Sequence, residues 1–112
     1  MSLITDGNPL EHHISLAEIY DKQGRVAMSL KEAKLALDHN PSKEKEVAIK
    51  LFIAKAYTKL GDINKSTELY RQLLDEGVYL PPVLLGILHN NLTQNKYAKV
   101  KKNIHLVKLF DI

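Results

Sequence analysis

Two stretches of this chain follow the same residue pattern, and this internal repeat constrains the fold more than any other feature. Aligning Gly24 with Gly61 places Tyr20 opposite Tyr57, in each case just ahead of the glycine. A third, weaker copy follows, in which Asn95 stands at the glycine position. A chain that repeats in this way folds as a series of similar supersecondary units, each packed against the next.

The spacing of apolar residues indicates that each copy consists of two helices. Apolar or small residues recur three, four and seven positions apart, which is helical rather than strand spacing. Gly24 and Gly61 lie between the two apolar stripes of their hairpins, where the chain needs a left-handed backbone that glycine adopts without strain. Asparagine, which is residue 95 in the third copy, is a common substitute for glycine in this conformation. We expect six helices, over about residues 9–23, 26–39, 43–60, 63–76, 82–94 and 97–110.

Polar residues and prolines mark the boundaries between these helices. Asp62 follows its glycine and can cap the next helix, while residues 40–42 (Asn-Pro-Ser) and the pair Pro81-Pro82 separate successive hairpins. One hairpin cannot bury its own apolar face, so the core has to form between stacked neighbours, of which about three are needed. We expect repeat units at about 9–41, 43–79 and 82–112 within a domain of residues 9–112, and a disordered or cloning-derived leader at residues 1–8.

These residues resemble the tetratricopeptide repeat, a helical hairpin of about 34 residues. The chain departs from the family at Ser29 and Ser66, which stand where the family has alanine, and at His13 and Lys50, which stand where it has an aromatic residue. The first unit is also three residues longer than the family's, and the third unit matches the pattern least well. The matching positions are Gly24, Ala33, Ala36 and Pro41 in the first unit, then Gly61, Tyr70 and a delayed Pro81 in the second.

The resemblance implies an all-α solenoid of three stacked antiparallel helix pairs, wound as a right-handed superhelix. It also implies that the first helix of each pair lines a concave groove, where a peptide or amphipathic helix of another protein binds. The groove residues expected on this basis are Ile14, Glu18 and Asp21, then Leu51, Lys55 and Thr58, then Leu85, His89 and Leu92.

The chemistry of these groove positions suits a peptide or an amphipathic helix with apolar anchors. Glu18 and Asp21 make one end acidic, so a basic end of the ligand is expected there. An alternative stays open, in which the groove leucines only pack against neighbouring repeats. The interaction class is a protein-binding scaffold or adaptor.

Catalysis and cofactor binding find no support in the sequence. The chain has no cysteine, which excludes disulfides and thiolate chemistry and fits a cytoplasmic protein. No glycine-rich phosphate loop precedes a helix. His12 and His13 are adjacent, so their side chains would diverge by about 100° on a helix instead of chelating a metal. We therefore expect no enzyme activity, no cofactor, no metal site and no membrane span.

Two rival functions involve the lysine-rich and apolar residues that follow Asn90. Lys96, Lys99 and Lys102 share a helical face that could bind a polyanion such as nucleic acid, although a solvated lysine face is the preferred interpretation. The second rival is self-assembly, because the last expected helix is apolar around more than one stripe and could pair with another copy. The apolar residues of that helix are Ile104, Leu106, Val107, Leu109 and Phe110.

Overall fold

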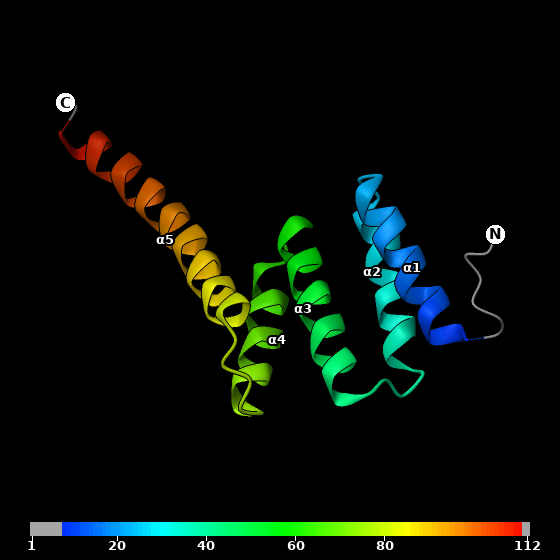
Figure 1. Ribbon diagram of the computed structural model, residues 1–112. Helices are drawn as coiled ribbons and strands as arrows, with labels where there is room; N and C mark the ends of the chain where they lie inside the picture. Colours follow the sequence, from blue (N-terminus) through cyan, green and yellow to red (C-terminus); the bar gives the residue numbers. More distant parts are fainter. Residues whose placement is uncertain (1–7, 111–112) are drawn as a thin grey trace.

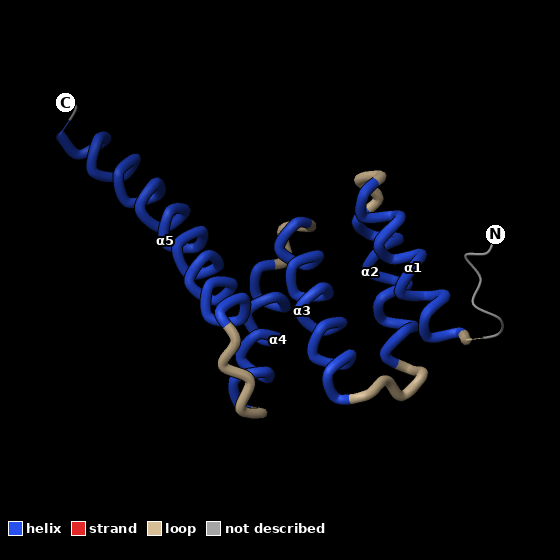
Figure 2. The backbone as a smooth tube through the Cα atoms, viewed as in Figure 1, coloured by secondary structure: helices blue, strands red, loops and turns tan. Residues whose placement is uncertain are grey.

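The computed structural model describes the backbone of residues 8–110 and the side chains of residues 8–95. Within these residues every regular element is a helix, as Figures 1 and 2 show. The prediction of an all-α chain is therefore confirmed, and the expected leader lies outside the described residues apart from Asn8. The helices are α1 (Pro9–Lys22), α2 (Val26–Leu37), α3 (Lys43–Lys59), α4 (Ile63–Asp75) and α5 (Pro81–Phe110).

The first two hairpins turn on the glycines that the repeat identified. Gly24 has a φ of +78° and Gly61 a φ of +85°, both in the left-handed region. The N–H of the residue after Gly24 donates to the carbonyl of Tyr20 at 2.9 Å, and the residue after Gly61 makes the same 2.9 Å bond to Tyr57. This bond spans the last turn of a helix that ends in a left-handed glycine. The fixed distance from tyrosine to glycine in the repeat therefore records one turn geometry used twice.

Side-chain hydrogen bonds cap the first turn of three of the helices. The side chain of Asn8 accepts a hydrogen bond from an N–H in the first turn of α1, Ser42 does so for α3 and Asp62 for α4, each at 3.3 Å. Each bond satisfies one of the backbone donors that a helix start leaves without a partner. The capping role predicted for Asp62 is confirmed.

The core consists of two apolar clusters that meet on α3. Helices that follow one another in the chain contact each other, and α3 also contacts α5. The first cluster contains Ala17, Leu30, Ala33, Ala36, Ile49, Ile53 and Ala56, and the second contains Ala54, Tyr70, Leu73 and Val83.

The third predicted hairpin is wrong, because α5 is one continuous helix from Pro81 to Phe110. Figure 1 shows it extending well past the other four helices. The sequence from residue 87 to 110 contains neither glycine nor proline, so no residue in it breaks a helix. Asn95, unlike Gly24 and Gly61, is compatible with a helix interior at modest cost, and the expected turn does not form there.

Candidate functional site

Helices α1 and α3 run in the same direction and are joined by ion pairs at both ends. Near their starts, Lys45 of α3 pairs with Glu11 of α1. Near their ends, the Nζ of Lys59 lies 2.8 Å from a carboxylate oxygen of Asp21. These two pairs link α1 and α3, the first helices of the first two hairpins (Figure 1), while α2 packs against both of them.

A cleft of about 280 Å³ lies between the two ion pairs, on the face shared by α1 and α3. Ala17 and Ala33 are buried there, and their short side chains leave space that larger residues would fill. The remaining lining is mostly apolar, with charged groups at the rim. It comprises Ile14, Ala48, Ile49 and Phe52 together with Glu11, Glu18 and Lys45.

A second cleft of about 450 Å³ lies between α3 and α5, next to Tyr70 of α4. Tyr70 is almost fully buried, and burial raises the pKa of its hydroxyl. A methyl group at Gly86 would overlap the Tyr70 ring, so only glycine allows α5 to approach this closely. The other lining residues are Lys55, Thr58, Lys59, Pro82, Leu85, His89 and Asn90.

The two clefts differ in charge. Glu18 lies at the first cleft and Lys55 at the second, both exposed, and neither forms an ion pair with another described side chain. Lys59 also borders the second cleft, but Asp21 neutralises it. The unpaired charge is therefore negative at the α1–α3 cleft and positive at the α3–α5 cleft.

Most of the groove residues predicted from the sequence border these two clefts. Ile14 and Glu18 line the first cleft, and Lys55, Thr58, Leu85 and His89 line the second.

Three predicted groove residues lie elsewhere. Leu51 lines a separate hollow of about 480 Å³ between α3 and the loop before α5. Asp21 is engaged with Lys59, and Leu92 is 53% exposed on α5 and lines neither cleft.

A buried polar network behind the second cleft was not predicted from the sequence. Asn90 is 1% exposed, and its side-chain amide donates to Ser66 at 2.9 Å and to Thr67 at 3.0 Å. Its carbonyl oxygen accepts a hydrogen bond from the hydroxyl of Thr58 at 3.1 Å. Asn90 follows Val83 at the seven-residue spacing of a buried helix face, which is the signal that could have identified it.

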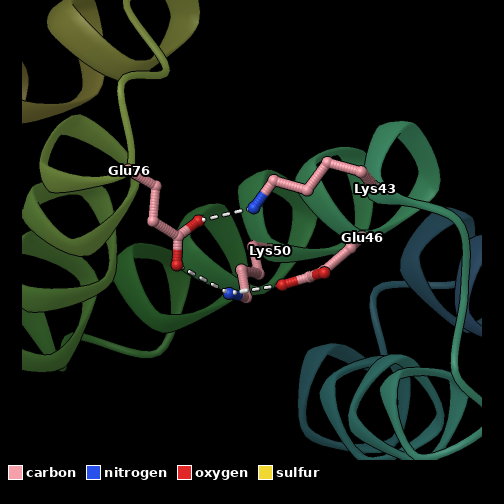
Figure 3. Close-up of polar contacts among 4 residues, drawn as sticks. All are labelled: Lys43, Glu46, Lys50 and Glu76. Atoms are coloured by element: carbon pink, nitrogen blue, oxygen red, sulfur yellow. Dashed lines mark hydrogen bonds and ion pairs between the residues drawn. The ribbon is translucent and has the colours of Figure 1, made fainter.

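An ion-pair cluster holds the open end of the α3–α4 hairpin, away from both clefts (Figure 3). The Nζ of Lys50 lies 2.8 Å from Glu46 and 3.4 Å from Glu76, and the Nζ of Lys43 lies 3.0 Å from Glu76. The hydrogen bond from Lys43 lowers the pKa of Glu76, and the bond between Lys50 and Glu46 lowers the pKa of Glu46 while raising that of Lys50. The cluster ties α4 to α3 and plays a structural role.

Other predicted sites can be placed only in part. No three His, Asp or Glu side chains among the described residues are gathered so that they could hold a metal ion. Within the part of the chain that the structure describes, no helix combines the length and the apolar character that crossing a membrane requires. The side chains of the possible polyanion patch, Lys96, Lys99 and Lys102, lie outside the described residues.

Comparison of the chain with protein-family models, with curated proteins and with solved structures finds no match. What this surface does therefore has to be inferred from its own residues and geometry.

Proposed function

We propose that this chain is a non-catalytic adaptor that binds a peptide or an amphipathic helix of another protein. The groove is the face on which α1, α3 and α5 lie. The observation that carries the proposal is the pair of clefts on this face, one between α1 and α3 and one between α3 and α5. Concave sites with apolar linings and a few polar groups at the rim are the usual form of a ligand site.

The arrangement of the first two hairpins supports the interpretation of this groove as the concave face of a tetratricopeptide-like repeat. The turns at Gly24 and Gly61 share one geometry, and α1 and α3 run in the same direction with an ion pair near each end. In this reading α5 supplies the first helix of a third unit, because Val83 and Asn90 pack it against the second hairpin. Three successive first helices would then form the concave surface of a short solenoid.

The charges of the two clefts indicate how a ligand would be oriented. A basic residue of the ligand would lie near Glu18, and an acidic residue near Lys55, with apolar side chains entering the clefts between them. An extended peptide and an amphipathic helix can both present such anchors.

The test is a selection of binding peptides from a random peptide library, followed by titration of the selected peptides by fluorescence anisotropy. Charge reversal at the rims, Glu18→Lys or Lys55→Glu, should weaken binding by about tenfold. The matched control is Lys31→Glu on the exposed surface of α2, which should leave affinity within about twofold. If no peptide binds, or if binding ignores both cleft variants, the proposal fails.

A further inference from the structure

Two histidines meet at the open end of the first hairpin, where the second hairpin has an ion pair. The repeat alignment matches His13 with Lys50 and His39 with Glu76. In the second hairpin the Nζ of Lys50 lies 3.4 Å from a carboxylate oxygen of Glu76. In the first hairpin the rings of His13 and His39 stack, with their centroids 5.3 Å apart and their planes inclined by 22°. The same contact is thus made by opposite charges in one hairpin and, in the other, by two rings that carry like charges when protonated.

A carboxylate of α2 completes the cluster in the first hairpin. An oxygen of Glu32 lies 2.6 Å from Nδ1 of His13, and the side chains of Glu32 and His13 are 15% and 20% exposed. Water therefore screens this contact less than it screens a pair on the open surface. A proton on His13 makes both partners charged, which strengthens the hydrogen bond between them. The cluster therefore gains stability from one proton.

A second proton on the cluster would place two positive rings in contact. His39 stacks on His13, and a single carboxylate neutralises a single imidazolium. Among the described side chains, Glu32 is the one carboxylate within ion-pair distance of either ring. Asp38 and the carbonyl end of α2 adjoin His39 in the chain, but both residues are exposed, so solvent screens their attraction for its charge. The second positive charge is therefore repelled by the first.

The other charged groups near His13 do not replace the missing carboxylate. His12 lies beside it on α1, with the two ring centroids 5.7 Å apart, and a proton on His12 would add more positive charge. From α3, Lys45 reaches the start of α1, where it pairs with Glu11. Each proton after the first therefore adds a positive charge without a partner.

We propose that His13, Glu32 and His39 form a proton-sensitive latch, which holds the open end of the first hairpin closed with one proton and releases it with two. Histidine is the side chain that ordinarily changes its charge between about pH 5 and 8, so the histidine latch responds in this range. The pair of the second hairpin keeps its charges there, because the pKa of Glu76 is lowered and that of Lys50 is raised. The two hairpins thus differ in how they respond to acid.

The histidine latch adjoins the cleft between α1 and α3. On α1, Glu11 and Ile14 lie within two residues of His13 and line that cleft. His39 lies in the segment that connects α2 to α3, directly before Asn40, whose φ is +50°. Release of the latch would therefore disturb the cleft, and a ligand bound there should be held less tightly in acid. This consequence rests on the proposed groove binding, whereas the latch itself does not.

The latch is tested by melting temperatures, measured by circular dichroism from about pH 7.5 to about pH 5.5. His39→Gln removes the site of the second proton, and this variant should fold because His39 is exposed. By linkage, a proton that the unfolded chain accepts and the folded chain resists makes stability fall as the pH falls. Over this range the natural chain should therefore lose about 4 °C relative to His39→Gln.

Three further variants separate charge from packing. Glu32→Gln leaves a proton on His13 without a partner, so its loss in acid should exceed that of the natural chain. The double variant His13→Lys/His39→Glu rebuilds the ion pair of the second hairpin, and its loss should be as small as that of His39→Gln. The control is His12→Gln on the exposed side of α1, which should keep at least about half of the natural loss.

Two results would overturn the latch. Parallel curves for the natural chain and His39→Gln would show that His39 binds its proton equally well in the folded and the unfolded chain. A loss in Glu32→Gln no larger than the natural one would show that Glu32 does not neutralise His13.

The consequence for the cleft is tested by the affinity for a library-selected peptide that contains no histidine. Between about pH 7.5 and about pH 5.5 the natural chain should lose about threefold or more in affinity, and His13→Lys/His39→Glu should not. An equal loss in the two proteins would overturn the link between latch and cleft. If no peptide binds at all, the proposed function fails, and the melting temperatures still decide the latch.

Discussion

The side-chain amide of Asn90 in α5 donates a hydrogen bond to the hydroxyl of Ser66 in α4 across 2.9 Å. Both side chains are buried, and the bond lies where α3, α4 and α5 meet, behind the second cleft. Ser29, the counterpart of Ser66 in the first unit, instead donates to the carbonyl of Ala17 at 2.6 Å. At the same repeat position, Ser29 thus links the two helices of the first hairpin, whereas Ser66 attaches α5 to the second hairpin.

Replacing Asn90 should loosen α5. Asn90→Ala leaves the buried hydroxyl of Ser66 without the amide and opens a cavity, so the free energy of unfolding should fall by about 1–3 kcal/mol. Urea denaturation followed by circular dichroism measures the change. The neighbouring exposed residue provides the control, because Asn91→Ala should change stability by no more than about 0.5 kcal/mol. Equal effects of the two variants would contradict the role given to Asn90.

Gly86→Ala should destabilise the protein although it raises helix propensity. Alanine favours a helix over glycine by about 1 kcal/mol, but the added methyl group overlaps the buried Tyr70 ring, and overpacking costs about 1–3 kcal/mol. We expect a lower midpoint of urea denaturation. In a Tyr70→Leu background the same substitution should instead be neutral or stabilising. A gain of stability in the natural background would show that α5 does not pack closely on Tyr70.

The turn glycine of the second hairpin gives a prediction about backbone conformation alone. Gly61→Ala should lower the free energy of unfolding by about 1–2 kcal/mol, because its φ of +85° disfavours a side chain even though nothing blocks the added methyl group. Gly61→Asn should cost less, since asparagine tolerates this region better. The melting temperatures of the natural chain and the two variants give the order of stability. A Gly61→Ala variant that melts at the same temperature as the natural chain would rule out the left-handed turn.

The ion-pair cluster of α3 and α4 predicts how stability depends on pH. Glu46 and Glu76 have lowered pKa values, so they stabilise the folded protein at pH values above the ordinary pKa of 4.5. This stabilisation is lost as the pH falls through their folded-state pKa values. Lys50 has a raised pKa, so it stabilises the folded protein at pH values below its ordinary pKa of 10.5. This stabilisation is lost as the pH rises through the higher folded-state pKa.

The variant that tests this pH dependence is Glu76→Gln. It should flatten the acid side of a plot of melting temperature against pH, and the loss at neutral pH should be small because the pair is solvated. Glu44→Gln, on the same end of α3 but outside the cluster, is the control. An unchanged acid slope in Glu76→Gln would show that the cluster does not form in solution.

The first two hairpins were predictable because their boundaries depend on local chemistry. Gly24 and Gly61 are at positions that demand a left-handed backbone, and Ser42 and Asp62 cap helix starts through bonds within their own turns. Such signals act over a few residues and are visible in one sequence. The expected ends of α1 to α4 accordingly fall within two residues of the observed ends.

Local signals could not decide whether the chain turns at Asn95. Its prediction came from alignment with Gly61, yet asparagine permits a turn without requiring one. Whether α5 bends or continues at Asn95 depends on tertiary packing, which a local signal does not reveal. The Asn90 network was missed for a related reason, since its partners Thr58, Ser66 and Thr67 belong to other helices.

The period of the helix determines which residues of α1 and of α3 share a face, and this much is visible in the sequence. Ile14, Glu18 and Lys55 were expected beside the core stripe of their helices, and they line the two clefts. Ile14 also packs against the first core cluster. Asp21 could not be placed from the sequence, because its pairing with Lys59 depends on how α1 and α3 stack. Leu92 was assigned to the groove but is 53% exposed on α5 and lines neither cleft.

Backbone amide chemical shifts, measured for the isotope-labelled protein during titration with a library-selected peptide, locate the binding face in solution. We predict the largest shifts at residues of α1, α3 and α5 that border the two clefts, including Glu18, Lys55 and His89. The exposed surfaces of α2 and α4 should shift little. Shifts confined to α2 and α4, or to the exposed residues Leu84 and Leu88 of α5, would contradict binding in the groove.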